Sequence, residues 1–140
     1  MSTEKNRQLI ERFFVALNNG DRDALVANMT DDFAFQGMGR HPDWIRYRWN
    51  REAFADAPKS LAALMKKSIF MNVRSTIAEG DRVAVQVDSS TEMKNGKIYD
   101  NAYLFIFTIK DDKVKEIQEY CCTYTVADRF GEYLGAPSPA

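Results

Sequence analysis

The sequence predicts a single α+β domain in which helices cover one face of an antiparallel β-sheet. Its 140 residues suit one domain. Apolar residues recur at helical spacing in the N-terminal half, whereas the C-terminal half shows strand-like alternation divided by short turns. Strands joined by short turns pair in an antiparallel meander, and the three helices then cover one face of it. We assign residues 1–135 to this domain and residues 136–140 to a flexible tail.

The helical half contains three predicted helices. Residues 3–19 carry one apolar stripe and end before Gly20, a residue that stops helices. Asp21 is placed to cap a short second helix. The third helix covers residues 51–67, and Pro58 within it predicts a kink or a break.

The predicted strands follow a short first strand at residues 33–35. A strand at residues 69–78 is followed by another at residues 82–93, and Asn95-Gly96 then forms a hairpin turn. The last and longest element is a hairpin over residues 98–124. We expect the chain after it to begin helical and then fray.

The first strand of the long hairpin predicts a small-molecule pocket. Alternation places Asn101, Tyr103, Phe105 and Phe107 on one face. Two polar side chains at the end of an apolar row are typical of a ligand pocket, which combines apolar walls with a few fixed polar groups. The alternative is that both polar side chains are hydrogen-bonded residues of an ordinary sheet.

Residues 36–50 form a predicted loop that is rich in aromatic residues. It contains Trp44, Tyr47 and Trp49, and loops seldom collect such residues unless they cover something. The loop is either a lid over the pocket or a segment fixed to the core by its own aromatic rings. His41 in this loop is a candidate acid/base, although a solitary loop histidine is more often structural or exposed.

Composition argues against several classes of function. The net charge is -1 and the basic residues are dispersed, so we expect no nucleic-acid partner. No apolar run reaches the roughly 18 residues of a membrane span, and the N-terminus lacks a signal-peptide core, so we expect a cytoplasmic protein without a membrane partner. Two adjacent cysteines and one histidine do not make a zinc site, and no cofactor motif occurs, so we expect neither metal nor cofactor.

Several segments resemble a known family. LIERFFVALNNGDRDAL and MTDDFAF resemble the opening of the SnoaL-like group, within the nuclear-transport-factor and ketosteroid-isomerase superfamily. EGDRVAVQVD, NGKIYDNAYLFIF and KVKEIQEYCCTYTV resemble its later strands. The resemblance implies a cone-shaped fold with a curved sheet wrapped round a long helix, a site inside the cone, and a homodimer. The row Val83, Val85 and Val87 would then lie outside and need a partner to cover it.

The resemblance also implies what the chain lacks. In ketosteroid isomerase a tyrosine of the first helix polarises the substrate carbonyl, and the matching position here is Phe13. The position of that enzyme's catalytic aspartate lies near Gly37, and its second oxyanion donor falls near Asn101. Steroid isomerisation by that mechanism is therefore disfavoured.

The same comparison singles out Asp88. The Arg-x-Asp of limonene epoxide hydrolase resembles Gln86-Val87-Asp88, and the second aspartate of that enzyme resembles Cys122, so its triad is incomplete here. In the polyketide cyclases of the SnoaL-like group an aspartate is the acid/base, and Asp88 is the candidate for that role, with Gln86 on the same strand face. The alternative is a hydrogen-bonded or solvated aspartate at the end of a strand.

The expected function is metal-free acid/base chemistry on a small apolar or polyketide- or steroid-like substrate. The reaction would be of the isomerase, dehydratase, cyclase or hydrolase type. The alternative is a non-catalytic module of the same fold that binds a hydrophobic molecule or dimerises. Glu119 points either to solvent or to the pocket mouth. The expected catalytic residues are Asp88, Tyr103 and His41, and the expected ligand-binding residues are Gln86, Asn101, Trp44, Trp49, Tyr47, Phe13, Phe105 and Cys122.

Overall fold

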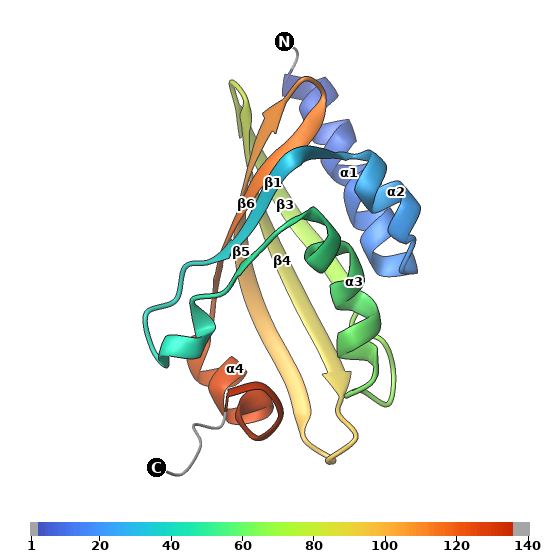
Figure 1. Cartoon of the computed structure of the whole chain (residues 1–140). Coiled ribbons are helices and arrows are strands. Elements are labelled where there is room, and N and C mark those ends of the chain that lie inside the picture. Colours follow the sequence, from blue (N-terminus) through green and yellow to red (C-terminus); the bar gives the residue numbers. More distant parts are fainter. Residues whose placement is uncertain (1–2, 136–140) are drawn as a thin grey trace.

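The computed structural model describes residues 3–135, which form one curved mixed β-sheet with helices against it (Figure 1). The helices are α1 (Thr3–Asn19), α2 (Arg22–Ala27), α3 (Arg51–Ala62) and α4 (Thr123–Phe130), with a 3-10 turn at Asp43–Ile45 and a π-helical turn at Gly131–Gly135. The strands are β1 (Met29–Gly37), β2 (Arg48–Trp49), β3 (Met71–Glu79), β4 (Arg82–Glu92), β5 (Ile98–Lys110) and β6 (Lys113–Cys121). The predicted α+β class is confirmed, and the tail predicted at residues 136–140 lies outside the described residues.

The sheet differs from the predicted meander in one respect. Its order is β2–β1–β6–β5–β4–β3, and β1 pairs with β6 in parallel, whereas the other pairs are antiparallel. The pairing places Phe35 opposite Ile117 and Gly37 opposite Glu119. The first strand is also longer than predicted, because residues on both sides of the predicted range 33–35 belong to β1. The parallel pair brings the loop after β1 to the end of β6.

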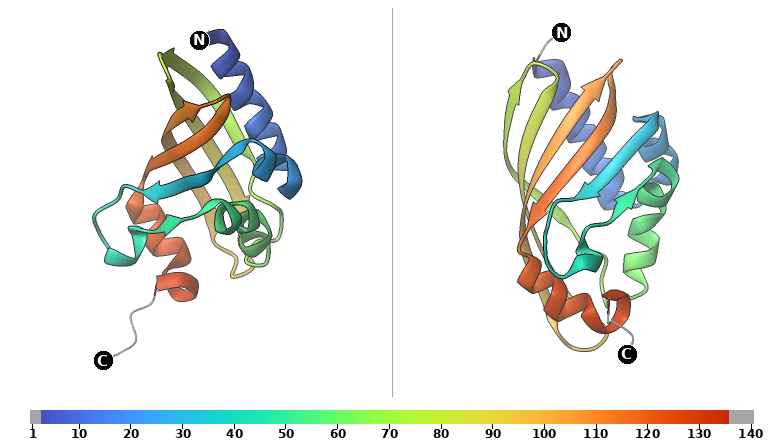
Figure 2. Two further views of the ribbon diagram at one scale, coloured as in Figure 1. Left: turned by 45° about the horizontal axis from the view of Figure 1, so that its top comes forward. Right: turned by 60° about the vertical axis from the view of Figure 1, so that its left-hand side comes forward.

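The long helix α1 lies along the concave side of the sheet (Figure 2). Hydrogen bonds attach one of its ends to β3 and the other to the turn that follows β3. Asn6 Nδ2 donates to the carbonyl of Gly80 over 3.0 Å, beyond one end of that strand. At the other end, the Asn18 side chain donates to the Met71 carbonyl over 3.0 Å and accepts from the Met71 main-chain N–H over 2.7 Å. The helix ends as predicted before Gly20, whose φ of 65° suits glycine.

The shorter helices follow local capping chemistry. Asp21 caps α2 by accepting from the Ala24 main-chain N–H over 3.2 Å, as predicted. Of the kink or break predicted at Pro58, the break does not occur, because α3 continues through this residue to Ala62. Asn50 starts α3 by accepting from the Ala53 main-chain N–H over 2.9 Å. No helix within residues 3–135 is both long enough and apolar enough to cross a membrane.

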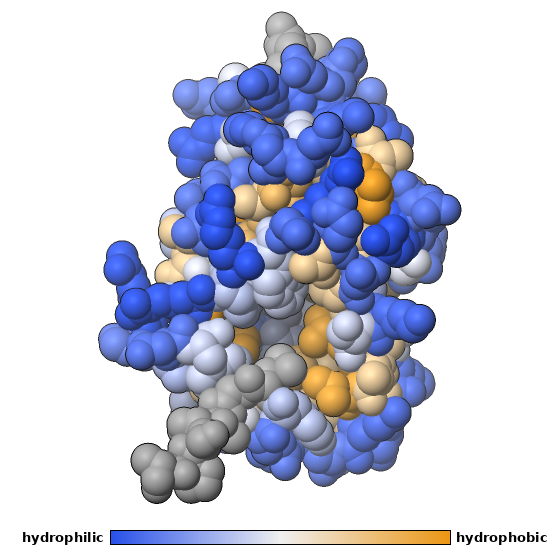
Figure 3. Space-filling model, viewed as in Figure 1, coloured by the Kyte–Doolittle hydropathy of each residue, from blue (hydrophilic) through white to orange (hydrophobic). Residues whose placement is uncertain are grey.

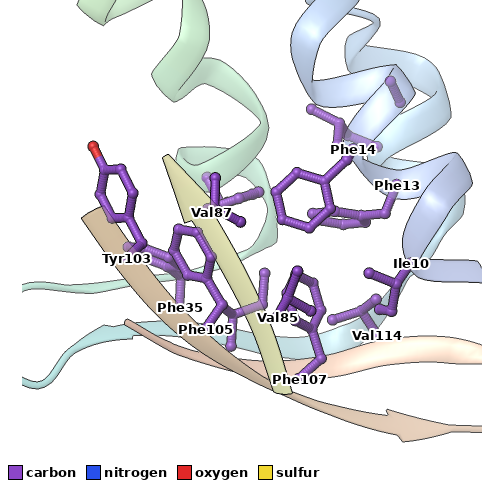
Figure 4. Packing of buried hydrophobic residues seen from close by; sticks show 14 of the residues in the cluster. Ile10, Phe13, Phe14, Phe35, Val85, Val87, Tyr103, Phe105, Phe107 and Val114 are labelled. Carbon is purple, nitrogen blue, oxygen red and sulfur yellow. The ribbon is translucent and has the colours of Figure 1, made fainter. Parts of the chain in front are cut away.

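The core lies between α1 and the concave face of β4 and β5 (Figure 4). Val85 pairs with Phe105 and Val87 with Tyr103, and directly paired residues of antiparallel strands share a face. The valine row is therefore on the inside, and its predicted position on the outer face is wrong. The buried side chains that meet there include Ile10, Phe13, Phe14, Val83, Val85, Val87, Phe105, Phe107 and Val114.

Candidate functional site

A cavity of about 660 Å³ lies beside this core, between the concave face of the sheet, α3, α4 and the loop after β1. The space-filling view shows a hollow on one face of the molecule, bordered by apolar patches (Figure 3). Most of the wall is apolar, and aromatic rings dominate it. The aromatic residues of the wall are Phe35, Trp44, Tyr47, Trp49, Phe54, Tyr99, Tyr103, Phe105 and Phe130.

Glu119 is the buried carboxylate of this wall. It belongs to β6 and pairs with Phe105 of β5, so its side chain shares the concave face with that ring. Its carboxylate accepts a hydrogen bond from the Tyr47 hydroxyl. Burial raises the pKa of Glu119 to about 7, because removal of water disfavours the charged form more than the Tyr47 hydrogen bond favours it.

The position of Tyr47 depends on a glycine in β1. A Cβ at Gly37 would lie 2.4 Å from the Ile45 carbonyl oxygen and 2.8 Å from the Tyr47 ring. Only glycine therefore allows the loop to return this close to the strand. The Gly37 main-chain N–H donates to the Tyr47 carbonyl over 2.9 Å, and the Met38 N–H donates to the Glu119 carbonyl over 2.9 Å. These main-chain bonds hold the loop and β6 together, which brings Tyr47 to Glu119.

The loop aromatics form one side of the cavity. Phe35 of β1 stacks on Tyr47 with ring centroids 5.7 Å apart and on Trp49 with centroids 5.2 Å apart. Tyr47 and Trp49 also stack on each other at 4.8 Å. Each of the two loop rings is half-buried and lines the cavity. The same rings are thus fixed to the core by stacking on Phe35 and line the cavity, so both interpretations of the loop, a cover for the pocket or a segment fixed to the core, are compatible with these contacts.

A second set of polar side chains in the cavity wall lies on β5, the strand that pairs with the strand of Glu119. The hydroxyls of Tyr99 and Tyr103 are 2.5 Å apart, and both rings line the cavity. Asn101 Nδ2 donates to the Tyr99 oxygen over 3.0 Å, and Ser89 Oγ donates to the Tyr103 oxygen over 3.2 Å. Burial is the main cause that raises the pKa of both tyrosines, so both hydroxyls keep their protons at neutral pH.

The structure brings together five of the residues that the sequence singled out. Tyr103 and Phe105 come from β5, Trp44 and Tyr47 come from the segment between β1 and β2, and Trp49 belongs to β2. All five line the cavity. Asn101 shares the face of Tyr103 as predicted, but it lies behind the wall, where its partners are protein groups.

Asp88 and Gln86 lie on the opposite face of the sheet, so their predicted position inside the cone is wrong. Asp88 Oδ2 accepts from Arg74 over 2.6 Å, and the side chain is 45% exposed. Gln86 is exposed and accepts from Ser75 over 2.6 Å. The cause is the two-residue period of a strand, which puts residues 86 and 88 outside once Val85 and Val87 pack inside.

Three other predicted site residues are also outside the cavity wall. Phe13 is fully buried in the core, where its ring meets that of Phe107 at 5.4 Å. His41 is an exposed residue of the loop. Cys122 is exposed because β6 ends at Cys121, and its sulfur accepts from Thr125 Oγ1 over 3.3 Å, which lowers the pKa of the thiol.

Sequence reasoning missed or left open several residues of the site, among them Glu119, Tyr99 and Phe54. The orientation of Glu119 was open, although its pairing with Phe105 follows once the hairpin register is known. Tyr99 lies two residues before Asn101, so the same alternation that identified Asn101 and Tyr103 places it on their face. Phe54 belongs to the apolar face of the third helix, but helical periodicity does not show that this face borders a cavity, which follows from the packing of α3 on β1.

A curved mixed sheet with helices against its concave side is the architecture of the NTF2-like class of proteins. The family described as SnoaL-like domain matches residues 10–117, and the chain belongs to this family. No curated protein matches the sequence.

Solved structures agree on the fold. An NTF2-like protein from Burkholderia xenovorans is 26% identical, covers 92% of this chain and 98% of its own, and superposes with a TM-score of 0.74. A protein with a ketosteroid-isomerase-like fold from Catenulispora acidiphila, in complex with trimethylamine, is 13% identical with a TM-score of 0.72, covering 88% of this chain and 92% of its own. TerC co-crystallised with polyporic acid is 16% identical with a TM-score of 0.73, covering 91% of this chain and 98% of its own.

Proposed function

We propose that this protein is a small-molecule enzyme that transfers a proton on an apolar substrate, with Glu119 as the acid/base. The reaction class is that of isomerases, cyclases, dehydratases or hydrolases acting on small apolar or polyketide- or steroid-like molecules. The observation that carries the proposal is the Glu119 carboxylate in the wall of an aromatic cavity, with a pKa raised to about 7. A carboxyl group with such a pKa exchanges protons readily near neutral pH.

Two features of the cavity support this assignment over a role for Asp88. The hydroxyls of Tyr99 and Tyr103 lie on the same concave face as Glu119, so a bound molecule meets a proton-transfer group and hydrogen-bonding groups together. The volume of about 660 Å³ suits a small organic molecule. The fold neighbours in complex with trimethylamine and with polyporic acid show that related folds take up small molecules.

The test uses acetophenone, an apolar ketone whose methyl protons exchange through an enolate. In D₂O the wild-type protein should accelerate deuterium uptake at the methyl group, measured by proton NMR. The rate should rise as Glu119 ionises, with a midpoint near its pKa of about 7. Glu119→Gln should lower the rate by at least about a hundredfold, the usual contribution of a general base.

Asp88→Asn is the matched control, because it makes the same chemical change on the opposite face of the sheet. Its exchange rate should stay within about twofold of the wild type, as expected for an exposed side chain outside the cavity. Acetophenone that binds without any Glu119-dependent exchange would reject the enzyme and favour the alternative, a protein that only binds an apolar ligand. Failure of acetophenone to enter the cavity would count against both.

We also propose that the protein is a homodimer formed through the outer face of the sheet. The valine row no longer supports this, but Ile77, Leu104 and Tyr120 on that face are 71%, 39% and 45% exposed. Leu104 pairs with Tyr120, so an apolar strip crosses neighbouring strands. Sedimentation velocity should show a dimer at micromolar concentration and a monomer for Leu104→Glu. Val15→Glu, at a 61%-exposed site on α1, should remain dimeric.

A further inference from the structure

A chain of hydrogen-bonded side chains behind the cavity wall has one more donor hydrogen than it has acceptors within the protein. The chain runs from Asn101 through Tyr99 and Tyr103 to Ser89, and it is buried. Two of its members, Tyr99 and Tyr103, reach the cavity, while Asn101 and Ser89 lie behind them. The direction of each hydrogen bond decides what the two tyrosines offer to a ligand.

The main chain fixes the orientation of the Asn101 amide. Asn101 Oδ1 accepts from the main-chain N–H of Ala102 over 2.8 Å and from that of Cys122 over 3.1 Å. A main-chain N–H can only donate, so the oxygen of the amide must face these two groups. Asn101 Nδ2 consequently faces the Tyr99 oxygen at 3.0 Å and the Cys122 carbonyl at 3.3 Å, and it donates to both.

The tyrosine pair thus receives a donor at each end. Asn101 donates to Tyr99, and Ser89 donates to Tyr103. One hydroxyl proton lies between the two tyrosine oxygens, which are 2.5 Å apart. The other hydroxyl proton has no acceptor among the described residues, whichever tyrosine carries it, and the side that both rings share is the cavity.

We propose that the Tyr99–Tyr103 pair donates this hydrogen bond to an oxygen of the bound substrate, and that Asn101 is the positioning residue that makes it available. The substrate class is therefore an apolar molecule with a carbonyl or similar acceptor oxygen. A donor held in a cavity of low polarity stabilises negative charge that develops on such an oxygen. This inference rests on the proposed function, since Glu119 would remove the proton while the tyrosine pair stabilises the resulting enolate.

Asn101→Asp tests the direction of the chain by an almost isosteric change. A carboxylate accepts but does not donate, so Tyr99 would donate to residue 101 and Tyr103 would donate to Tyr99. With Ser89 still donating to Tyr103, every proton is then used within the protein, and the cavity receives none. Ser89→Ala is the matched control from the same network, because Asn101, Tyr99 and Tyr103 still point one proton into the cavity.

The measurement is the isotope-edited infrared spectrum of acetophenone bound to each protein, taken as the difference between ¹²C and ¹³C carbonyl labels. A carbonyl that accepts a hydrogen bond stretches at a lower frequency than it does in hexane. We expect this lowering in the wild type and in Ser89→Ala, and its loss by more than about half in Asn101→Asp. The double variant Tyr99→Phe/Tyr103→Phe should lose it as well, which keeps the test decisive if Asn101→Asp does not fold.

A wild-type protein that fails to bind acetophenone or to lower its carbonyl frequency overturns the inference, as does a folded Asn101→Asp that keeps the lowering. Persistence of the lowering in the double variant overturns it too. Failure of the proposed function gives a different result. Glu119→Gln should abolish deuterium exchange but keep the infrared signature, so a protein with the signature and no exchange retains the donor and loses only the assignment of Glu119.

Discussion

Glu119 and Asp88 are two carboxylates on one sheet, two strands apart and on opposite faces. Glu119 on β6 is buried in the cavity wall, with a tyrosine hydroxyl as its partner and a pKa raised to about 7. Asp88 on β4 is 45% exposed and pairs with Arg74, which is itself 61% exposed. The residue type is nearly the same, and the strand face decides whether the group faces water and a cation or an apolar cavity.

The comparison shows that the raised pKa of Glu119 follows from removal of water around the carboxyl group. Neither carboxylate stands out by its neighbours in sequence, since Gln118 and Tyr120 flank Glu119 and Val87 and Ser89 flank Asp88, one polar residue in each case. What distinguishes Glu119 is the pairing of β6 with β5 on one side and with β1 on the other, which covers it with Phe105 and the loop. Experiments that change burial or partners on one face should therefore leave the other unaffected.

The largest expected effect is on the pH dependence of stability. The pKa of Glu119 rises from 4.5 to about 7 on folding, so between these values the folded state holds a proton that the unfolded state has released. The free energy of unfolding contributed by this group should therefore fall as pH rises from about 4.5 to about 7, by up to about 3 kcal/mol, and should change no further above that range.

Urea unfolding of the wild type and of Glu119→Gln, followed by circular dichroism across this pH range, measures the effect. The glutamine does not titrate, so the difference between the two curves isolates Glu119 from every other group. That difference should decline with rising pH through the stated window. Parallel curves would mean that Glu119 is hydrated in the folded protein, and the contrast with Asp88 would then disappear.

A smaller effect is expected at Gly37. Gly37→Ala places a methyl group 2.4 Å from the Ile45 carbonyl oxygen and 2.8 Å from the Tyr47 ring, and the backbone carbonyl cannot move aside cheaply. We expect a loss of about 1–3 kcal/mol of stability, as for overpacking in a core. Displacement of Tyr47 should also raise the pKa of Glu119 further, since the hydrogen bond that lowers it is weakened. Carbon NMR of the carboxyl group reports this change.

Gly131→Ala is the control, because no atom lies within 4 Å of an added Cβ and its φ of -54° is helical. It should leave the Glu119 pKa unchanged and raise stability slightly, by up to about 1 kcal/mol, through the lower entropy of the unfolded chain. Equal behaviour of the two variants would show that the loop is free to move away from β1, contrary to the packing described above.

The sequence was sufficient for the fold class and for five of the nine aromatic residues in the cavity wall. Residues 3–19 gave a clear helical stripe, and the alternation of β5 placed Asn101, Tyr103 and Phe105 on one face, because both depend only on local periodicity. The loop aromatics Trp44 and Tyr47 were found because loops rarely contain them without a reason.

The position of Asp88 was predicted wrongly because the resemblance outweighed the periodicity. In β4 the valines at 83, 85 and 87 are the apolar row, and alternation alone puts them inside and Asp88 outside. Matching Asp88 to an aspartate of the family reversed this choice. Glu119 was undecided for a different reason: its environment comes from the parallel pairing with β1, and no local pattern predicts a partner some eighty positions earlier in the chain.

The smallest effect is expected for the outer carboxylate. A double-mutant cycle with Asp88→Asn and Arg74→Gln should give a coupling of about 0–1 kcal/mol, because both side chains are exposed and water screens their attraction. The cycle should be measured by urea unfolding at a protein concentration low enough to keep the chain monomeric. A coupling above about 2 kcal/mol under these conditions would mean that the pair is desolvated, which is typical of buried ion pairs.

Because the proposed dimer covers the outer face, the coupling should grow when the same cycle is repeated at a concentration where sedimentation shows a dimer. A coupling that stays small at both concentrations would place the dimer interface away from Asp88, and would leave the outer carboxylate as a solvated surface group in both states.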